Sequence, residues 1–211
     1  MTRWPAAVVA VMSLLVAAAC SSGTATSMKQ SPSDLINHPA AGAYQGFGLV
    51  PPLPRPSFTL TDIGGKPFPF GTRTAGRPTL LFFGYTQCPD VCPTTMLDIR
   101  NALLGVPSSL RARVDVVFVT TDVKHDTATA IAAWLAKFDT GLPNRFIGLR
   151  GDQVQVDTAQ AAAHVQLAED EGRQHAANVL LYGSDDYARV QFLQNTNEAE
   201  QIAHDLPLVA R

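Results

Sequence analysis

The sequence predicts one α/β domain, a three-layer sandwich with an N-terminal β-hairpin, which follows an export segment. Two apolar runs of strand length alternate with two segments of helical periodicity, as is typical of strands buried between helices. Hairpin patterns precede and follow this central part of the sequence. The chain has 211 residues and 46% of them are apolar, which is sufficient for one core of moderate size.

A short hairpin and two buried strands are the first expected elements. Residues 57–60 and 67–70 flank Asp62-Ile63-Gly64-Gly65, and a glycine pair readily adopts the positive φ of a hairpin turn. Residues 79–84 (TLLFFG) and 114–121 (VDVVFVTT) are nearly continuous apolar runs. We therefore expect these two runs to form the centre of the sheet.

Helical spacing follows each of the two central strands. Met96, Ile99 and Leu103 recur at that spacing, so they predict a helix that begins near Pro93. Residues 131–138 repeat the pattern, and Asp126 or Thr127 can cap the start of this second helix.

The C-terminal part of the chain predicts further elements with less regular patterns. They are a strand at 145–149, an Ala-rich helix at 152–163, a short strand at 165–167, a closing hairpin of 178–182 and 189–193, and a last helix at 198–204 that ends before Pro207. This order of elements predicts a thioredoxin-like sandwich.

Residues 1–19 have the pattern of a bacterial signal peptide. Arg3 precedes an uncharged apolar stretch, and the small residues that end it favour cleavage directly before Cys20. A cysteine at this place resembles the lipobox of bacterial lipoproteins, although Ala17 stands where Leu, Ile or Val is usual. The resemblance implies that Cys20 is lipidated and anchors the chain to the extracytoplasmic face of the cell membrane. An uncleaved anchor or plain secretion is the alternative.

Residues 20–56 predict a flexible tether that leads to the domain at 57–211. They are rich in Ser, Gly, Ala and Pro and show no sustained period. No apolar run after the N-terminal segment approaches the ~18–20 residues that span a bilayer. Only 16% of residues are charged and the net charge is −2, so we expect no nucleic-acid partner.

One pair of cysteines carries the expected chemistry. Of the three cysteines, Cys20 is assigned to lipid, which leaves Cys88 and Cys92 in the segment GYTQCPDVCP. The pair follows a buried strand and opens a helix, where free N–H groups and the helix dipole favour a thiolate over a thiol. Metal binding and thiol redox chemistry both need that thiolate. Tyr85 and Phe83 are expected to serve packing.

The spacing of the two cysteines favours a metal over a redox motif. A CxxC pair here would be a thioredoxin motif, but three residues intervene. Cβ atoms four residues apart on a helix are ~5–6 Å apart, wider than the ~3.5–4.5 Å of a disulfide. Two sulfurs at that separation can bind one ion, and soft thiolates select Cu(I) or Zn(II). A structural disulfide in an oxidising compartment is the alternative.

These segments resemble the Sco/SenC family. The resemblance rests on GYTQCPDVCP, on TTDVKHDT after the second strand, on FIGLRG at 146–151 and on His175 before the next apolar strand. It covers roughly residues 56–193. Members are membrane-anchored, thioredoxin-like proteins that help to assemble the dinuclear copper site of cytochrome c oxidase. The resemblance implies copper, as Cu(I), Cu(II) or both, on Cys88, Cys92 and His175, and the copper-site subunit of the oxidase as partner.

Two departures from the family pattern concern the surroundings of the site. The family's Asp-Pro-x-x-Asp-Thr is Asp122-Val123-Lys124-His125-Asp126-Thr127 here, and its Asp-His-Ser/Thr is Gln174-His175-Ala176. The missing acid beside His175 bears on copper affinity and on the preferred oxidation state, and it removes no ligand. His125 is the next candidate if His175 is not the third donor, although a cap or surface role suits it better.

Two functions remain open from the sequence. The first is a membrane-tethered copper metallochaperone, and the second is a thiol:disulfide oxidoreductase in which Cys88 and Cys92 cycle between dithiol and disulfide. Ala176-Ala177 occupy the place of the cis-proline of thioredoxins, which argues against general thioredoxin activity. A thiol peroxidase is not expected, because neither cysteine has a Thr three residues before it. A zinc site would need a second histidine close by.

Overall fold

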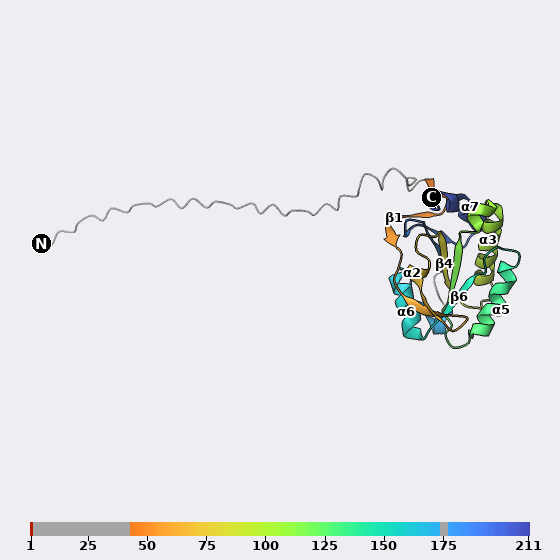
Figure 1. Ribbon diagram of the computed structural model, residues 1–211. Helices are drawn as coiled ribbons and strands as arrows, with labels where there is room; N and C mark the ends of the chain where they lie inside the picture. Colours follow the sequence, from red (N-terminus) through yellow and green to blue (C-terminus); the bar gives the residue numbers. More distant parts are fainter. Residues whose placement is uncertain (2–42, 174–176) are drawn as a thin grey trace. The chain divides into compact units, whose positions relative to one another are not determined.

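The computed structural model describes Met1 and residues 43–173 and 177–211 (Figure 1). The signal segment 1–19, Cys20 and most of the predicted tether lie outside these residues. The described strands form one eight-stranded sheet in the order β1-β8-β7-β4-β5-β6-β2-β3. The strands are β1 (Phe47–Pro54), β2 (Thr59–Asp62), β3 (Pro67–Pro69), β4 (Thr79–Gly84), β5 (Asp115–Thr120), β6 (Ile147–Arg150), β7 (Asn178–Tyr182) and β8 (Tyr187–Leu193).

Helices cover both faces of this sheet. The described helices are α2 (Phe70–Arg73), α3 (Val91–Gly105), α4 (Ser108–Arg111), α5 (Ala128–Asp139), α6 (Gln153–Ala162), the 3₁₀ turn η2 (Asp170–Gly172) and α7 (Glu198–Val209). Figure 1 shows α3, α5 and α7 on one side of the sheet and α2 and α6 on the other. The predicted three-layer α/β sandwich with an N-terminal hairpin, formed by β2 and β3, is confirmed.

The centre of the sheet follows the two apolar runs. β4 is parallel to β5, and β5 is parallel to β6, whereas β7 joins β4 antiparallel. Every residue of β4 is buried, as a strand with helices on both faces requires. The carboxyl ends of β4, β5 and β6 therefore lie at one edge of the sheet, where α/β folds place their sites.

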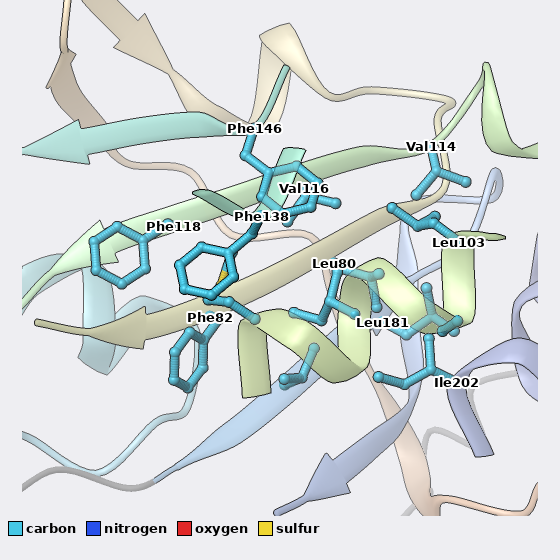
Figure 2. Close-up of a cluster of buried hydrophobic side chains, with 14 of the residues drawn as sticks. Leu80, Phe82, Leu103, Val114, Val116, Phe118, Phe138, Phe146, Leu181 and Ile202 are labelled. Atoms are coloured by element: carbon cyan, nitrogen blue, oxygen red, sulfur yellow. The ribbon is translucent and has the colours of Figure 1, made fainter. Parts of the chain in front are cut away.

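Each face of the sheet has its own apolar core. Figure 2 shows the core under α3, α5 and α7, where Phe82 and Phe118 of the sheet lie near Phe138 of α5, and Leu181 of β7 lies near Ile202 of α7. On the other face, aromatic and aliphatic side chains from β2, β3 and α2 pack with those of α6. Burial of apolar area on both faces, at ~25 cal/mol per Å², is the main force that holds the layers together.

Local signals fix the helix starts. Thr127 caps α5 by accepting a hydrogen bond from the N–H of Ala130, as predicted. Asp152 and Gln155 form a reciprocal capping box at α6. α3 begins at Val91, so Pro93 lies in its first turn, where the missing N–H costs no helical hydrogen bond.

The prediction that all of residues 20–56 form a flexible tether is wrong, because residues 47–54 form strand β1. It pairs antiparallel with β8 at the end of the sheet. Prolines are tolerated in an edge strand, since the N–H groups they remove would face solvent. The residues before β1 are also held, since the buried carboxylate of Asp205 accepts hydrogen bonds from the N–H groups of Gln45 and Gly46 at 2.8–3.1 Å.

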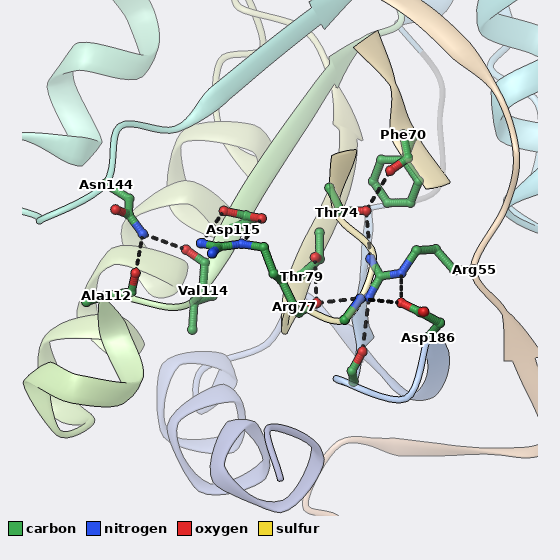
Figure 3. A network of polar contacts seen from close by, with 12 residues as sticks. Arg55, Phe70, Thr74, Arg77, Thr79, Ala112, Val114, Asp115, Asn144 and Asp186 are labelled. Atoms are coloured by element: carbon green, nitrogen blue, oxygen red, sulfur yellow. Dashed lines mark hydrogen bonds and ion pairs between the residues drawn. The ribbon is translucent and has the colours of Figure 1, made fainter. Parts of the chain in front are cut away.

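Arg55, which follows β1, forms hydrogen bonds to several other segments of the chain (Figure 3). The side chain of Arg55 is buried and donates hydrogen bonds to the Asp186 carboxylate and the Thr74 hydroxyl, both at 2.8 Å. It also donates to the carbonyl oxygens of Arg77 and Gly183 at 2.9 and 3.0 Å. The folded domain therefore begins before the predicted residue 57.

Two further predictions near the C-terminus are wrong. Residues 165–167 form no strand, because the side chain of Gln160 supplies the hydrogen bonds, donating to the Gln166 carbonyl and accepting from the Ala168 N–H. α7 does not end before Pro207 but continues to Val209. Pro207 lies in the last turn, where it removes a single helical hydrogen bond. No described helix is both long enough and apolar enough to cross a bilayer.

Candidate metal centre

The site begins where the central strand β4 ends. Cys88 lies in the turn after β4, and Cys92 lies in the first turn of α3 with 0% of its surface exposed. Both are free thiols. Gly84 makes room for the buried Cys92, because a Cβ at position 84 would lie 3.0 Å from the Cys92 Sγ and 2.9 Å from the ring of Phe82. The strand can therefore pass directly beside the buried sulfur.

Cys88, the outer and partly exposed cysteine, caps the helix that carries Cys92, the inner and buried one. The N–H of Cys92 donates to the Cys88 Sγ at 3.3 Å. Burial alone would raise the pKa of Cys88, but the N–H groups of Cys92 and Asp90, and the side chains of Cys92 and Tyr85, hydrogen bond to its sulfur. These bonds outweigh burial, so the pKa of Cys88 is lowered.

The two cysteines are electrostatically unequal. Burial raises the pKa of Cys92, and the neighbouring Cys88 adds to that effect. The prediction that the helix start favours a thiolate thus holds for Cys88 and is wrong for Cys92. A metal ion must displace the proton of Cys92 when it binds there.

Tyr85 contributes to the site beyond packing. It is 9% exposed, and its side chain hydrogen bonds to Cys88. Its pKa is raised, first by burial and then by the negative charge that develops on Cys88. The sequence signal for this role was the position of Tyr85 in the turn between strand and cysteine, three residues before Cys88.

A buried carboxylate holds the turn that carries Cys88. Asp126 accepts hydrogen bonds from the N–H and the hydroxyl of Thr86, at 2.9 and 2.5 Å, and from the hydroxyl of Thr120 at 2.5 Å. The turn after β4 is thereby tied to the end of β5. The sequence suggested only a helix-capping role for Asp126, and Thr127 performs it instead.

A pocket of about 250 Å³ opens beside Cys88. Arg173 and Ala177, which lie on either side of residues 174–176, are both part of its wall. His175 itself lies outside the described residues. The described chain thus leads into and out of the histidine segment at the pocket of the cysteines. The remaining lining residues are Tyr85, Pro89, Asp90 and Val91.

The other described histidines either contact a carboxylate or lie exposed on the surface. The Nδ1 of His125 lies 2.8 Å from the buried carboxylate of Asp122, and the Nδ1 of His204 lies 2.7 Å from Asp205. His164 is exposed and has a positive φ of 56°. Within 43–173 and 177–211, no three His, Cys, Asp or Glu side chains converge as a metal site would need. The described residues therefore contribute the cysteine pair to the candidate site.

Comparison with known proteins identifies the family of the chain. A sequence model of the SCO1/SenC family matches residues 52–210. The chain belongs to the SCO1/SenC family. The residues that match the Sco family model include the end of strand β1 from Pro52 onward, which agrees with a folded domain that begins before residue 57.

Two bacterial relatives illustrate the extent of the similarity. A protein of Stutzerimonas stutzeri is 34% identical over 143 residues, which cover 63% of this chain and 68% of that protein. The SCO2-like protein of Rickettsia conorii is 30% identical over 140 residues, which cover 66% of this chain and 63% of the relative.

Solved structures of Sco proteins have the same fold. Copper-bound ScoI of Bradyrhizobium japonicum is 30% identical, with a TM-score of 0.60, over 75% of this chain and 99% of that one. Apo Sco1 of Thermus thermophilus is 27% identical, with a TM-score of 0.67, over 79% and 97%. BsSco, a member of the Sco family of cytochrome c oxidase assembly proteins with a disulfide switch, is 18% identical and shares the fold with a TM-score of 0.60. The thioredoxin-like expectation is confirmed.

Proposed function

We propose that this chain binds one copper ion through Cys88, Cys92 and His175 and delivers it to the copper-site subunit of cytochrome c oxidase. The observation that carries the proposal is the pocket beside Cys88, whose wall includes both residues that flank 174–176. The copper bound to ScoI of B. japonicum supports copper as the metal.

The chemistry of the described sulfurs suits Cu(I). Two thiolates are soft donors that prefer Cu(I), and an imidazole is a ligand for either copper oxidation state. Cys88, partly exposed and with a lowered pKa, offers the first sulfur to an arriving ion. Cys92 then exchanges its proton for the metal, so the ion ends against a sulfur that water does not reach.

The difference in exposure between Cys88 and Cys92 also supports an order in which the two sulfurs release copper. A thiolate of the receiving protein can approach copper through the pocket on the Cys88 side. Exchange would then replace Cys88 first, whereas the enclosed Cys92 would leave last. Stepwise replacement keeps the copper ligated throughout the transfer.

Copper titration of the reduced full chain tests this function. We expect one tightly held copper per chain, and loss or marked weakening of binding in Cys88→Ser, Cys92→Ser and His175→Ala. Lys66→Ala, an exposed residue of the β2–β3 turn, is the control and should bind as the wild type does. Reduced wild-type chain that retains no copper after desalting would overturn the proposal. Unchanged affinity in His175→Ala would exclude His175 as ligand and leave the thiolates.

A thiol:disulfide reductase is the second candidate, favoured by the unequal pKa values of two neighbouring free thiols. The Cys88 thiolate would attack one sulfur of a target disulfide and release the other as a thiolate. Cys92 would then lose its proton and attack the Cys88 sulfur. The target would gain two electrons, and the chain would be left with a Cys88–Cys92 disulfide. Cys92→Ser should trap the mixed disulfide, and recovery of none with reduced copper-free chain would exclude this activity.

We further propose that Cys20 carries lipid and holds the protein at the extracytoplasmic face of the cell membrane. The small residues before Cys20 support this assignment. Labelling of growing cells with a palmitate analogue tests it. Label and membrane association should both be lost in Cys20→Ala, and wild-type chain that is unlabelled would contradict the assignment.

A further inference from the structure

A second pocket opens at the edge of the sheet where β5 and β6 end. It has a volume of about 480 Å³, which lies within the range of small-molecule sites. Its wall is formed by Thr61 of β2, Val123 of the chain after β5, and the segment that joins β6 to α6. The carboxyl ends of parallel strands are where α/β folds bind their ligands. No residue of this wall belongs to the pocket beside Cys88.

The wall contains a cation without a partner. Arg150 is the last residue of β6 and lies opposite Thr61 of β2 in the sheet. Its Nε is shielded from water, and within residues 43–173 and 177–211 its guanidinium forms no hydrogen bond or ion pair. Because no bond holds this side chain, it can turn toward an acceptor in the pocket and regain the hydrogen bonds that burial removes. The planar fork of a guanidinium matches the two oxygens of a carboxylate.

The acid in the wall is bound elsewhere. The carboxylate Oδ1 of Asp152 accepts the N–H of Gln155 at 2.8 Å, and the Asp152 N–H donates to the Gln155 side chain at 2.9 Å. This capping box fixes Asp152 at the start of α6. Gly151, between the two charged residues, lies so close to Leu60 and Gln155 that a Cβ would meet their side chains at 2.8 and 2.9 Å. The wall therefore presents a positive and a negative group that do not pair with each other.

We propose that this pocket binds a small molecule that carries a carboxylate and, beside it, an ammonium or hydroxyl group, as α-amino and α-hydroxy acids do. Arg150 binds the carboxylate. Asp152 accepts a hydrogen bond from the ammonium or hydroxyl group through Oδ2, which the helix cap does not use. Val123, which packs against the core below the pocket, contacts the apolar part of the molecule. The site is separate from the proposed copper function.

Four compounds with one carbon skeleton test the chemistry. L-Valine and 2-hydroxy-3-methylbutanoate carry both groups, 3-methylbutanoate lacks the second group, and L-valinamide lacks the carboxylate. Each is titrated into the reduced, ¹⁵N-labelled full chain in detergent, and the backbone amide signals of Gly151 and Gln153 report binding at the pocket. We expect the first two to bind, 3-methylbutanoate to bind about 10-fold more weakly, and L-valinamide to cause no saturable shift. The amide signal of Cys88 should stay unchanged throughout.

Variants of the two charged residues assign the contacts. Arg150→Gln should abolish binding, and Arg150→Lys, which keeps the charge and loses the fork, should weaken it about 10-fold. Asp152→Asn keeps a helix cap and should make L-valine and 3-methylbutanoate bind alike. Lys137→Gln removes the same charge from an exposed position of α5, on the other face of the sheet, and should bind as wild type does.

Absence of a saturable shift with both L-valine and the hydroxy acid would overturn the proposal. So would wild-type affinity in Arg150→Gln, or equal affinity of the wild type for L-valine and L-valinamide. The comparison of these two compounds uses the wild type and is decisive even if a variant fails to fold. Arg150→Gln should bind copper as the wild type does, so loss of this site and loss of the copper function are separate results.

Discussion

The backbone N–H of Cys92 donates to the sulfur of Cys88 across 3.3 Å, so one cysteine of the pair caps the helix that contains the other. This hydrogen bond helps to lower the pKa of Cys88, whereas burial raises the pKa of Cys92 and keeps the enclosed sulfur protonated. A pair of this kind can bind a metal, or attack a disulfide, in a fixed order, first through Cys88 and then through Cys92.

Selective alkylation should reveal this order. In reduced copper-free chain near neutral pH, we expect iodoacetamide to modify Cys88 at least ~10 times faster than Cys92, because the thiolate is the reactive form. The lowered pKa of Cys88 means that its reaction rate should reach half of its maximum at a lower pH than for an ordinary cysteine. Peptide mass spectrometry of Cys88→Ser and Cys92→Ser would assign the sites, and equal rates would contradict the inequality.

The close approach of β4 to the inner sulfur predicts the effect of Gly84→Ala. Its Cβ would meet the Cys92 Sγ at 3.0 Å, the Phe82 ring at 2.9 Å and the Phe118 ring at 3.2 Å. Overpacking of this kind should lower the free energy of unfolding by ~1–3 kcal/mol and weaken copper binding. Gly105→Ala on α3 is the matched control, because its Cβ would meet only Ala203 at 3.7 Å. Urea unfolding measures both, and wild-type stability in Gly84→Ala would refute the packing argument.

Stability should depend on pH through a buried acid at the start of α7. Glu198 is 0% exposed, and burial, followed by the charge of Asp98, raises its pKa from 4.5 to about 7. The folded chain therefore keeps a proton that the unfolded chain loses between these pH values, so the free energy of unfolding falls as pH rises from 4.5 to about 7. Above that range the loss is complete, on the order of 3 kcal/mol.

Paired variants isolate this contribution. Glu198→Gln should remove the fall and gain stability relative to wild type as pH rises from 4 to 8. The exposed neighbour Glu200→Gln should follow the wild-type profile. Parallel profiles for wild type and Glu198→Gln would show that Glu198 titrates at an ordinary pKa.

Strand β1 and Arg55 predict where a stable fragment has to begin. A fragment of residues 43–211 keeps both, whereas one of residues 57–211 loses strand β1, which pairs with β8, and the four side-chain hydrogen bonds of Arg55. We expect the shorter fragment to be less stable by at least ~2 kcal/mol, since buried polar groups lose their partners. Arg55→Met in the longer fragment separates the side chain from the strand, and thermal unfolding is the measurement. Equal stability of the two fragments would exclude a structural role for this segment.

The parts of the fold that the sequence predicted are those that burial encodes locally. β4 coincides with the apolar run 79–84, and the cap of α5 was visible in Thr127. β1 was missed because an edge strand needs no apolar period and tolerates the prolines that suggested a tether. The strand predicted at 165–167 was wrong because Val165 is buried for its contribution to the core, while Gln160 replaces the strand partner.

The proximity of the two cysteines was predictable, whereas their electrostatics were not. Cys88 and Cys92 follow from strand, spacing and helix start, and the structure brings them together. Their unequal pKa values depend on burial by residues distant in sequence, and the hydrogen bond from Tyr85 depends on how the turn closes. The role of Asp126 likewise requires knowing that the ends of β4 and β5 are neighbours.

The pairing of β1 with β8 makes completion of the fold depend on a strand that is synthesised long after β1. Arg55 and Asp186, which meet beside this pair, are 131 residues apart in sequence. Contacts of such high separation form late, because the loop between them must close first. Until β8 has formed, β1 remains unpaired. The prolines at 51, 52 and 54 have no N–H groups, so β1 has fewer hydrogen-bond donors than an ordinary strand. The same residues that disguise the strand in the sequence therefore limit its pairing with other chains before its own partner arrives.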